Sequence, residues 1–312
     1  MTMADKTYVW CTYRDWSFKI LEGLQDLDGW KTGLIVTTPE CKYDFFRLEQ
    51  RGIPILRVNP KKDLKEGQVA YNTLKELKPA TVFHNGWSWI VPKEFHEMCP
   101  NVVLHPGKLP KDRGGSPIQN QILNGETWTY NNLMEVGEGL DEGKVYDRTP
   151  ILLDGEADDV WARMTATGLI LCRDYLRNVA AGTARAEPQQ GEPIVYKRVT
   201  PERSLITPNR NLTARQIYDI VRAHNETDPN SYIVPARIAV GGKHELVIDR
   251  ATLDDRVAQR ASAIITLTPE LILDADGLAA LCTNVNKGEF ALALNGSDSK
   301  PVYLTRVYVR AV

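Results

Sequence analysis

A histidine at the end of an apolar strand is the first feature of this sequence that could do chemistry. His105 closes the run VVLHP, and the loop PGKLPKDRGG combines prolines, which stiffen the backbone, with glycines, which free it. Ser116 and Pro117 then predict the first turn of a short helix. A rigid loop and a helix N-terminus beside an imidazole can hold a polar ligand, although a lone histidine at a strand end is more often structural than catalytic.

The elements that must position this histidine alternate between strand and helix. Five apolar or β-rich runs predict strands at 7–13, 33–38, 53–59, 80–87 and 101–106. The segments between them carry apolar residues at helical spacing. Near-continuous apolar strands alternating with helices predict a parallel sheet buried on both faces, whose ligand site lies beyond the carboxyl ends of the strands. His105 stands at such an end; the alternative is the same α/β core with its site elsewhere.

The 312 residues are enough for two domains. We predict a doubly wound, mostly parallel, Rossmann-like α/β domain over residues 1–182. Residues 183–193 are polar and contain Pro and Gly, which is typical of a linker. One helix and several short β-like runs then predict a smaller α+β domain over residues 194–312, β-rich and OB-like.

Composition argues against several classes of protein. A net charge of −2 and a pI of about 6.3 do not suit a protein held to nucleic acid by a basic face. The cysteines are scattered without a C-x-x-C pair, which indicates reduced thiols and no metal site. No run nears the ~18 apolar residues of a membrane span, and neither the dinucleotide-binding nor the P-loop glycine motif occurs. We therefore expect a cytoplasmic protein with no membrane partner.

Two separated motifs resemble those of a known family. The segment VLHPGKLPKDRGGSPIQ and the later EGLDEGKV are similar to the patterns N-x-H-x-S-L-L-P-x-x-R-G-x-x-P-I and G-L-D-x-G of the 10-formyltetrahydrofolate-dependent formyltransferases. That family includes the methionyl-tRNA, glycinamide ribonucleotide and amino-sugar N-formyltransferases. The resemblance covers residues 80–153 strongly and the C-terminal region loosely.

This resemblance implies an enzyme that moves the formyl group of 10-formyltetrahydrofolate to a primary amine. His105 and Asp141 match the family's catalytic histidine and aspartate, although spacing alone would make Asp141 a turn residue. An oxyanion develops on the formyl oxygen, so a protonated His105 supported by Asp141 could stabilise it, and either group could relay the amine proton. The family's folate pocket maps onto Gly86, Trp87, Ile90, Val91, Val136, Gly137, Gly139 and Leu140. Trp87 and Trp89 could equally be core aromatics.

One catalytic position departs from the family pattern, because Val103 stands where the family has asparagine. Valine has no hydrogen-bond donor, and losing one oxyanion donor typically costs ~2.7–4 kcal/mol. Asn101 lies too far from His105, roughly 13 Å along the strand. We hypothesise that Asn85, at the end of the neighbouring strand, supplies the donor, with His84 pointing the other way. The alternative is a catalytically silent protein that binds folate or a nucleotide sugar.

The acceptor amine is predicted from what surrounds the motifs. The further domain argues against the glycinamide ribonucleotide enzyme, and the low pI weakens the methionyl-tRNA alternative. GGSPIQNQILNGE is similar to the branch that formylates nucleotide-linked amino sugars, so we expect such a small-molecule acceptor and no nucleic acid. Amino-acid or natural-product amines remain alternatives, as does a folate hydrolase, which normally carries an extra N-terminal domain. Dimerisation through the C-terminal domain is plausible.

The stiff loop is the expected contact for the diphosphate of that acceptor. The residues that could face it are Lys108, Pro110, Lys111, Arg113 and Gly114. The simpler interpretation of the charged members is ordinary, solvated loop charge.

Overall fold

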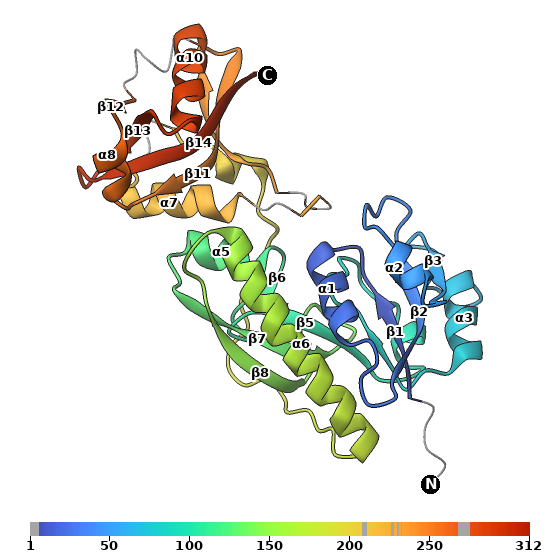
Figure 1. Cartoon of the computed structure of the whole chain (residues 1–312). Helices are drawn as coiled ribbons and strands as arrows, with labels where there is room; N and C mark the ends of the chain where they lie inside the picture. The colour runs from blue at the N-terminus through green and yellow to red at the C-terminus, as the bar shows by residue number, and fades with distance from the viewer. Residues whose placement is uncertain (1–5, 208–210, 226–227, 230, 232, 268–274) are drawn as a thin grey trace.

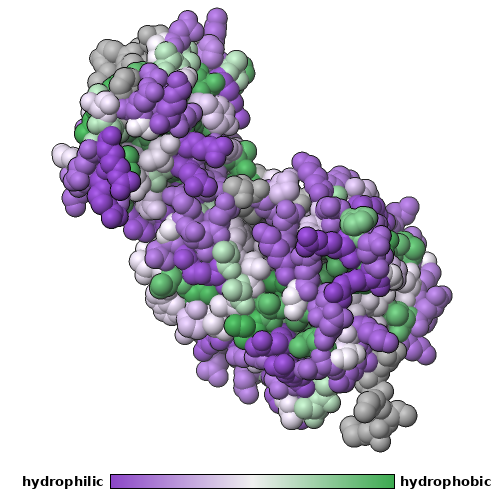
Figure 2. Space-filling view, in the orientation of Figure 1, coloured by the Kyte–Doolittle hydropathy of each residue, from purple (hydrophilic) through white to green (hydrophobic). Residues whose placement is uncertain are grey.

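The computed structural model describes residues 6–207, 211–225, 228–229, 231, 233–267 and 275–312. Figure 1 shows two units, a larger N-terminal one and a smaller C-terminal one. None of the described helices is long and apolar enough to cross a membrane. Figure 2 shows a surface dominated by hydrophilic residues, with a band of hydrophobic ones across the larger unit.

The N-terminal unit is built on a seven-stranded sheet in the order β3-β2-β1-β4-β5-β7-β8. Its strands are β1 (Thr7–Cys11), β2 (Lys31–Thr37), β3 (Ile55–Arg57), β4 (Thr81–Phe83), β5 (Asn101–Pro106), β7 (Trp128–Glu135) and β8 (Val145–Leu152). The first five strands of the order are parallel, and β7 and β8 join antiparallel. The predicted doubly wound, mostly parallel sheet is confirmed. β4 is shorter than the run 80–87 because the chain turns away after Phe83 to form a wall of the site.

Helices bury both faces of this sheet. They are α1 (Asp15–Gly23), α2 (Phe46–Glu49), α3 (Val69–Leu77), α4 (Lys93–His96), α5 (Pro117–Leu123) and α6 (Ala157–Ala181). Successive residues of a strand point to opposite faces. Tyr8 and Trp10 accordingly enter the core shared with α1 and α6, whereas Val9 and Cys11 enter the core shared with α3. This explains why the strands are apolar almost without interruption.

The C-terminal unit has a core of its own around a five-stranded sheet. The sheet has the order β10-β11-β14-β13-β12, with β10 (Ala236–Val240), β11 (His244–Thr252), β12 (Ala263–Thr266), β13 (Phe290–Asn295) and β14 (Pro301–Ala311). Its helices are α7 (Ala214–Ala223), α8 (Arg256–Arg260) and α10 (Ala275–Asn286), preceded by the short 3-10 helix η1 (Pro201–Ser204). A separate β-rich unit is thus confirmed. Figure 1 shows α7 facing α5, and Leu123 of α5 packs against the cores of both units.

The segment after α6, predicted as a linker over residues 183–193, lies partly against the N-terminal unit. Glu187 forms a bridge with Val145, and β9 (Val195–Tyr196) pairs in parallel with β6 (Arg113–Gly114) of the stiff loop. Residues 187–199 therefore lie along the N-terminal unit, and the boundary predicted at residue 193 falls inside this contact. A polar stretch with Pro and Gly can be ordered when a neighbouring segment satisfies its backbone hydrogen bonds.

Candidate active site

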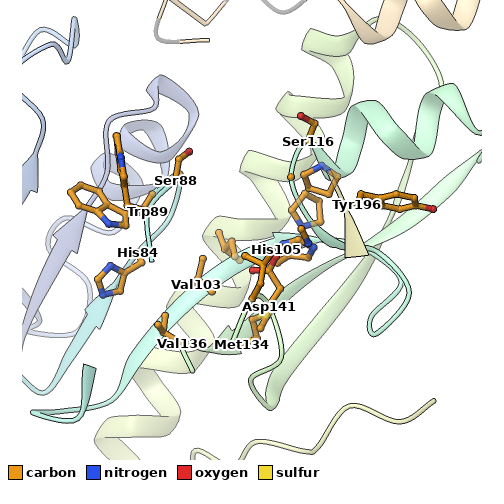
Figure 3. Close-up of a pocket in the computed structure, with 18 of the residues that line it drawn as sticks. His84, Ser88, Trp89, Val103, His105, Ser116, Met134, Val136, Asp141 and Tyr196 are labelled. Carbon is orange, nitrogen blue, oxygen red and sulfur yellow. Dashed lines mark hydrogen bonds and ion pairs between the residues drawn. The ribbon is translucent and has the colours of Figure 1, made fainter. Parts of the chain in front are cut away.

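A cavity of about 590 Å³ opens beyond the carboxyl ends of β4 and β5. It lies where the parallel part of the sheet gives way to the antiparallel strands, which is where such sheets bind ligands. Four walls surround it: the loop after β4, the stiff loop leading into α5, the turn between β7 and β8, and the segment around β9. Figure 3 shows side chains of these walls converging from segments far apart in the sequence.

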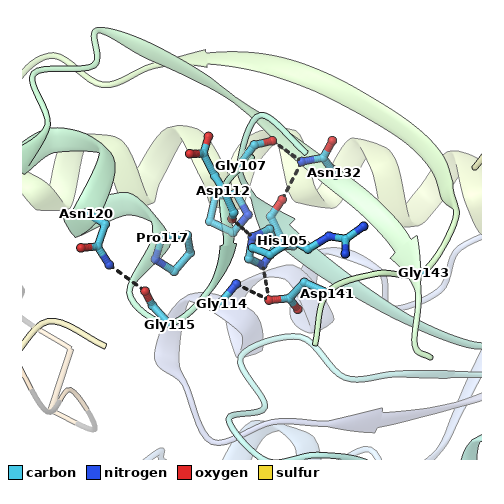
Figure 4. Close-up of polar contacts among 12 residues, drawn as sticks. His105, Gly107, Asp112, Gly114, Gly115, Pro117, Asn120, Asn132, Asp141 and Gly143 are labelled. Carbon is cyan, nitrogen blue, oxygen red and sulfur yellow. Dashed lines mark hydrogen bonds and ion pairs between the residues drawn. The ribbon is translucent and has the colours of Figure 1, made fainter. Parts of the chain in front are cut away.

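The structure brings the two predicted catalytic residues together in this cavity. Nδ1 of the buried His105 lies 3.5 Å from Oδ2 of Asp141 (Figure 4). Nε2 of His105 lies 2.6 Å from the carbonyl oxygen of Asp112. A carbonyl oxygen can only accept, so Nε2 carries a proton, and Nδ1 is the ring nitrogen left to exchange one. The site therefore holds an oriented imidazole with a carboxylate beside its reactive nitrogen.

The backbone around His105 is held by a side chain that the sequence did not single out. β5 pairs antiparallel with β7, which sets Asn132 opposite His105. Nδ2 of Asn132 donates to the carbonyls of His105 at 2.9 Å and Gly107 at 2.7 Å. A Cβ at Gly107 would lie 2.8 Å from the carbonyl oxygen of Asp112, so glycine lets that oxygen approach the imidazole. Gly107 stands where the family pattern has serine.

Asp141 is fixed in an uncommon backbone conformation. Its φ is +51°, in the left-handed region that residues with a side chain rarely adopt. Its Oδ2 accepts a hydrogen bond of 2.8 Å from the backbone N–H of Gly114 in the stiff loop. The carboxylate thus connects the turn between β7 and β8 to the loop that follows His105.

The hypothesis that Asn85 replaces the missing asparagine is wrong. Asn85 is fully buried outside the cavity, where its Oδ1 accepts a hydrogen bond of 2.7 Å from the N–H of Leu104. β4 and β5 pair with Phe83 beside Val102, so the following residue, His84, falls beside Val103 and lines the cavity with it. The sequence argument therefore assigned the two side chains to the wrong faces.

The part of the cavity wall around Val103 is mostly apolar. Met134 and Val136 line the same part of the cavity. Nε2 of His84 faces Oδ1 of Asn101 at 2.7 Å, and burial lowers the pKa of His84 to about 4. His84 is therefore neutral at neutral pH and adds no charge for an oxyanion.

Replacing Asn85 with alanine is expected to destabilise the fold rather than stop catalysis. The change leaves the N–H of Leu104 unsatisfied inside the protein, at a cost of roughly 1–3 kcal/mol. Denaturant unfolding should show this loss, while the turnover number of the folded fraction stays within about twofold of the parent. A large fall in turnover with unchanged stability would return Asn85 to the catalytic set.

All of the residues mapped to the folate pocket line the cavity. They are Gly86, Trp87, Ile90, Val91, Val136, Gly137, Gly139 and Leu140. Trp87 meets both interpretations, since it lines the cavity and also packs against the apolar core beneath it. Gly86 has a φ of +71°, and a Cβ there would lie 2.8 Å from Cβ of Arg14, so this tight turn requires glycine. Folate binding by these residues stays a prediction.

The cations predicted to face the acceptor lie elsewhere. Of the five loop residues only Gly114 lines the cavity. Nζ of Lys108 pairs with Glu126 at 2.5 Å and lies over the ring of Trp128. The guanidinium of Arg113 donates to Gln189, and Lys111 and Pro110 are outside the lining as well.

Three other cations line the cavity instead: Arg14, Lys197 and Arg198. Arg198 donates to the carbonyl of Ser88 at 3.0 Å, and Arg14 lies 3.6 Å from the carboxylate of Asp228 in the C-terminal unit. Sequence reasoning missed them because two follow the presumed linker and the third precedes α1. Within the described residues, no group of three or more His, Cys, Asp and Glu could hold a metal ion.

Comparison with known proteins agrees with this geometry. Residues 19–170, which include His105 and Asp141, match the family described as formyl transferase. A methionyl-tRNA formyltransferase from Thermus thermophilus is 35% identical over 148 residues, which cover 46% of this chain and 47% of that protein. Residues 19–170 belong to the formyl transferase family. It spans about half the length of the first curated relatives that it matches.

Solved structures extend the likeness to most of the chain. Methionyl-tRNA formyltransferase from Clostridium thermocellum is 25% identical with a TM-score of 0.58, covering 80% of this chain and 94% of that chain. A sugar N-formyltransferase from Shewanella, 16% identical with a TM-score of 0.58, covers 74% and 92%. HypX from Aquifex aeolicus in complex with tetrahydrofolic acid, 17% identical with a TM-score of 0.60, covers 96% and 43%. The last two likenesses concern the fold alone. The predicted family and fold are confirmed.

Proposed function

We propose that this protein is an enzyme that transfers the formyl group of 10-formyltetrahydrofolate to the primary amine of a small, anionic acceptor, a nucleotide-linked amino sugar. The observation that carries formyl transfer is the pairing, in one cavity, of His105 with Asp141, both of which lie in the region that matches the family. The cavity also has the size of a site for a small molecule.

The geometry of His105 suits proton transfer between two nitrogens. When the acceptor amine attacks the formyl carbon, a new C–N bond forms, the amine loses a proton, and the bond from the formyl carbon to N10 of the folate then breaks. Nδ1 of His105 takes the amine proton and returns it to N10, while Nε2 stays bound to the carbonyl of Asp112. Asp141 stabilises the positive imidazolium formed between the two steps. Because Val103 has no donor, that imidazolium is also the group that offsets charge on the formyl oxygen.

The charges of the cavity favour an anionic acceptor. Its lining contains the cations Arg14, Lys197 and Arg198 against the carboxylates Glu135 and Asp141. Lys197 and Arg198 follow β9, which pairs with the stiff loop beside Asp141, so they flank the reacting centre. A phosphate-bearing substrate gains from such a cluster, both in orientation and in its rate of encounter.

Methionyl-tRNA is the second candidate acceptor. It is favoured by the 35% identity to the Thermus thermophilus methionyl-tRNA formyltransferase over the catalytic half of the chain. The net charge of −2 weighs against it, because binding an RNA requires a basic surface.

The proposal is tested by following deformylation of 10-formyltetrahydrofolate with a panel of amines. The panel contains nucleotide-linked amino sugars, the same amino sugars without nucleotide, methionyl-tRNA, and a control without amine. We expect turnover that requires a nucleotide-linked amino sugar. Turnover with methionyl-tRNA alone would identify methionyl-tRNA as the acceptor. Turnover without any amine would identify a hydrolase. Folate binding without turnover would identify a binding protein.

Replacing Lys197 with glutamine is expected to weaken binding of the acceptor and to leave binding of the folate unchanged. Its side chain is exposed at the cavity wall, so loss of one contact to a phosphate should raise the KM of the acceptor about fivefold, equivalent to roughly 1 kcal/mol. The matched control is Lys111→Gln, which removes a loop cation outside the cavity and should leave this KM unchanged. Equal KM values for the two variants would contradict the assignment of this wall to the acceptor.

A further inference from the structure

A glutamine in the segment after α6 joins the two catalytic loops, and we propose that Gln189 is a positioning residue for formyl transfer. The inference rests on the proposed function, because it concerns how Asp141 is held for that reaction. Gln189 does not line the cavity, so it acts through other residues rather than on a substrate.

Four hydrogen bonds use the whole amide of Gln189. Its Oε1 accepts from Nε and Nη2 of Arg113 at 3.0 and 2.8 Å. Its Nε2 donates to the carbonyls of Asp141 at 2.9 Å and Gly143 at 2.8 Å. A guanidinium only donates and a carbonyl only accepts, so one orientation of the amide satisfies all four partners. These contacts are called the Gln189 bridge below.

The bridge closes a ring of hydrogen-bonded residues around the catalytic aspartate. Arg113 immediately precedes Gly114, whose N–H donates to the carboxylate of Asp141. Gln189 then connects the side chain of Arg113 back to the carbonyl of Asp141. The side chain and the main chain of Asp141 are therefore both tied to the stiff loop, which also carries the carbonyl partner of His105. Figure 4 shows Gly114 and Asp141 beside the imidazole of His105.

Asp141 needs such support because its backbone is strained. A left-handed φ in a residue other than glycine persists only where the surroundings impose it. The backbone of Gly143 packs closely against β7, since a Cβ there would lie 2.0 Å from the carbonyl oxygen of Glu135. The bridge holds the turn on its other side. Without it, the carboxylate of Asp141 would move relative to Nδ1 of His105.

The part of the turn that faces the predicted folate pocket is anchored separately. The N–H of Val136 donates to the carbonyl of Asn101 on β5 at 2.9 Å, outside the bridge. Loss of the bridge should therefore displace Asp141 more than the folate wall. This predicts a selective loss of turnover.

The test compares Gln189→Leu, Gln189→Glu and the neighbouring control Gln190→Leu in the full-length protein. Leucine removes all four hydrogen bonds, whereas glutamate can still accept from Arg113 and loses only the two bonds to the turn. We expect kcat to fall by roughly tenfold or more in both Gln189 variants, because small misplacements of catalytic groups are costly. The Kd of tetrahydrofolate should stay within about threefold of the parent. Gln190 is exposed, so its variant should match the parent in both measurements.

Amide hydrogen exchange supplies a readout without any substrate. Peptides covering residues 141–145, where the N–H of Val145 donates to the carbonyl of Glu187, should exchange roughly tenfold faster in both Gln189 variants, while peptides outside the three joined segments stay unchanged. A kcat for Gln189→Glu within about twofold of the parent would overturn the proposal, since only the anchoring of Arg113 would then matter. A parallel loss of kcat, folate binding and thermal stability would also overturn it, because Gln189 would then have a general structural role. If the parent itself transfers no formyl group, the proposed function fails, and unchanged exchange in the variants separately refutes the bridge.

Discussion

Replacing His105 with glutamine is expected to lower kcat by roughly 10²–10⁴-fold, the usual contribution of a general acid–base. The amide nitrogen of glutamine can still donate to the carbonyl of Asp112, as Nε2 of the imidazole does. It cannot provide the basic nitrogen that faces Asp141. The shape of the cavity is thus kept and its proton exchange is lost. The rate of amine-dependent deformylation at saturating substrates measures this change.

Folate affinity separates this effect from general damage. The Kd of tetrahydrofolate for His105→Gln should stay within about threefold of the parent, because the predicted folate wall is formed by other segments. The matched control is His244→Gln in the C-terminal unit, which should turn over like the parent. Turnover of His105→Gln close to that of this control would remove His105 from the mechanism.

The second large effect is expected for Asp141→Asn, with kcat falling by roughly 10²–10⁴-fold. Asparagine tolerates the left-handed backbone and its oxygen can still accept from the N–H of Gly114, so the turn should keep its shape. What is lost is the negative charge beside Nδ1 of His105, which stabilises the imidazolium. The kcat of transfer, measured at saturating substrates, reports this loss.

The same substitution at a neighbouring aspartate is the control. Asp112→Asn keeps the backbone carbonyl that accepts from His105 and changes only a carboxylate that accepts from the N–H of Lys108. It should lower kcat far less than Asp141→Asn. Since His105 and Asp141 act as a unit, the double variant should be little slower than His105→Gln alone. Equal losses at the two aspartates, or additive losses in the double variant, would contradict this mechanism.

The sequence by itself determined the architecture of the catalytic unit and its central pair. Apolar runs buried on both faces indicated parallel strands, because hydrophobic spacing is a local property of the chain. His105 at the end of β5 and Asp141 in a glycine-rich turn were both found from motifs. The structure places the two side chains beside each other in the cavity.

The tertiary structure alone decided which side chains surround that pair. The strand register of β4 against β5 turned His84 toward the cavity and Asn85 away from it, and alternation within one strand does not reveal which face is which. The pairing of β9 with β6 brought Lys197 and Gln189 to a loop more than 70 residues earlier in the chain. Such long-range pairings depend on the shape of the assembled sheet, which no local pattern records. Composition therefore indicated a linker where the fold holds residues 187–193 against the N-terminal unit.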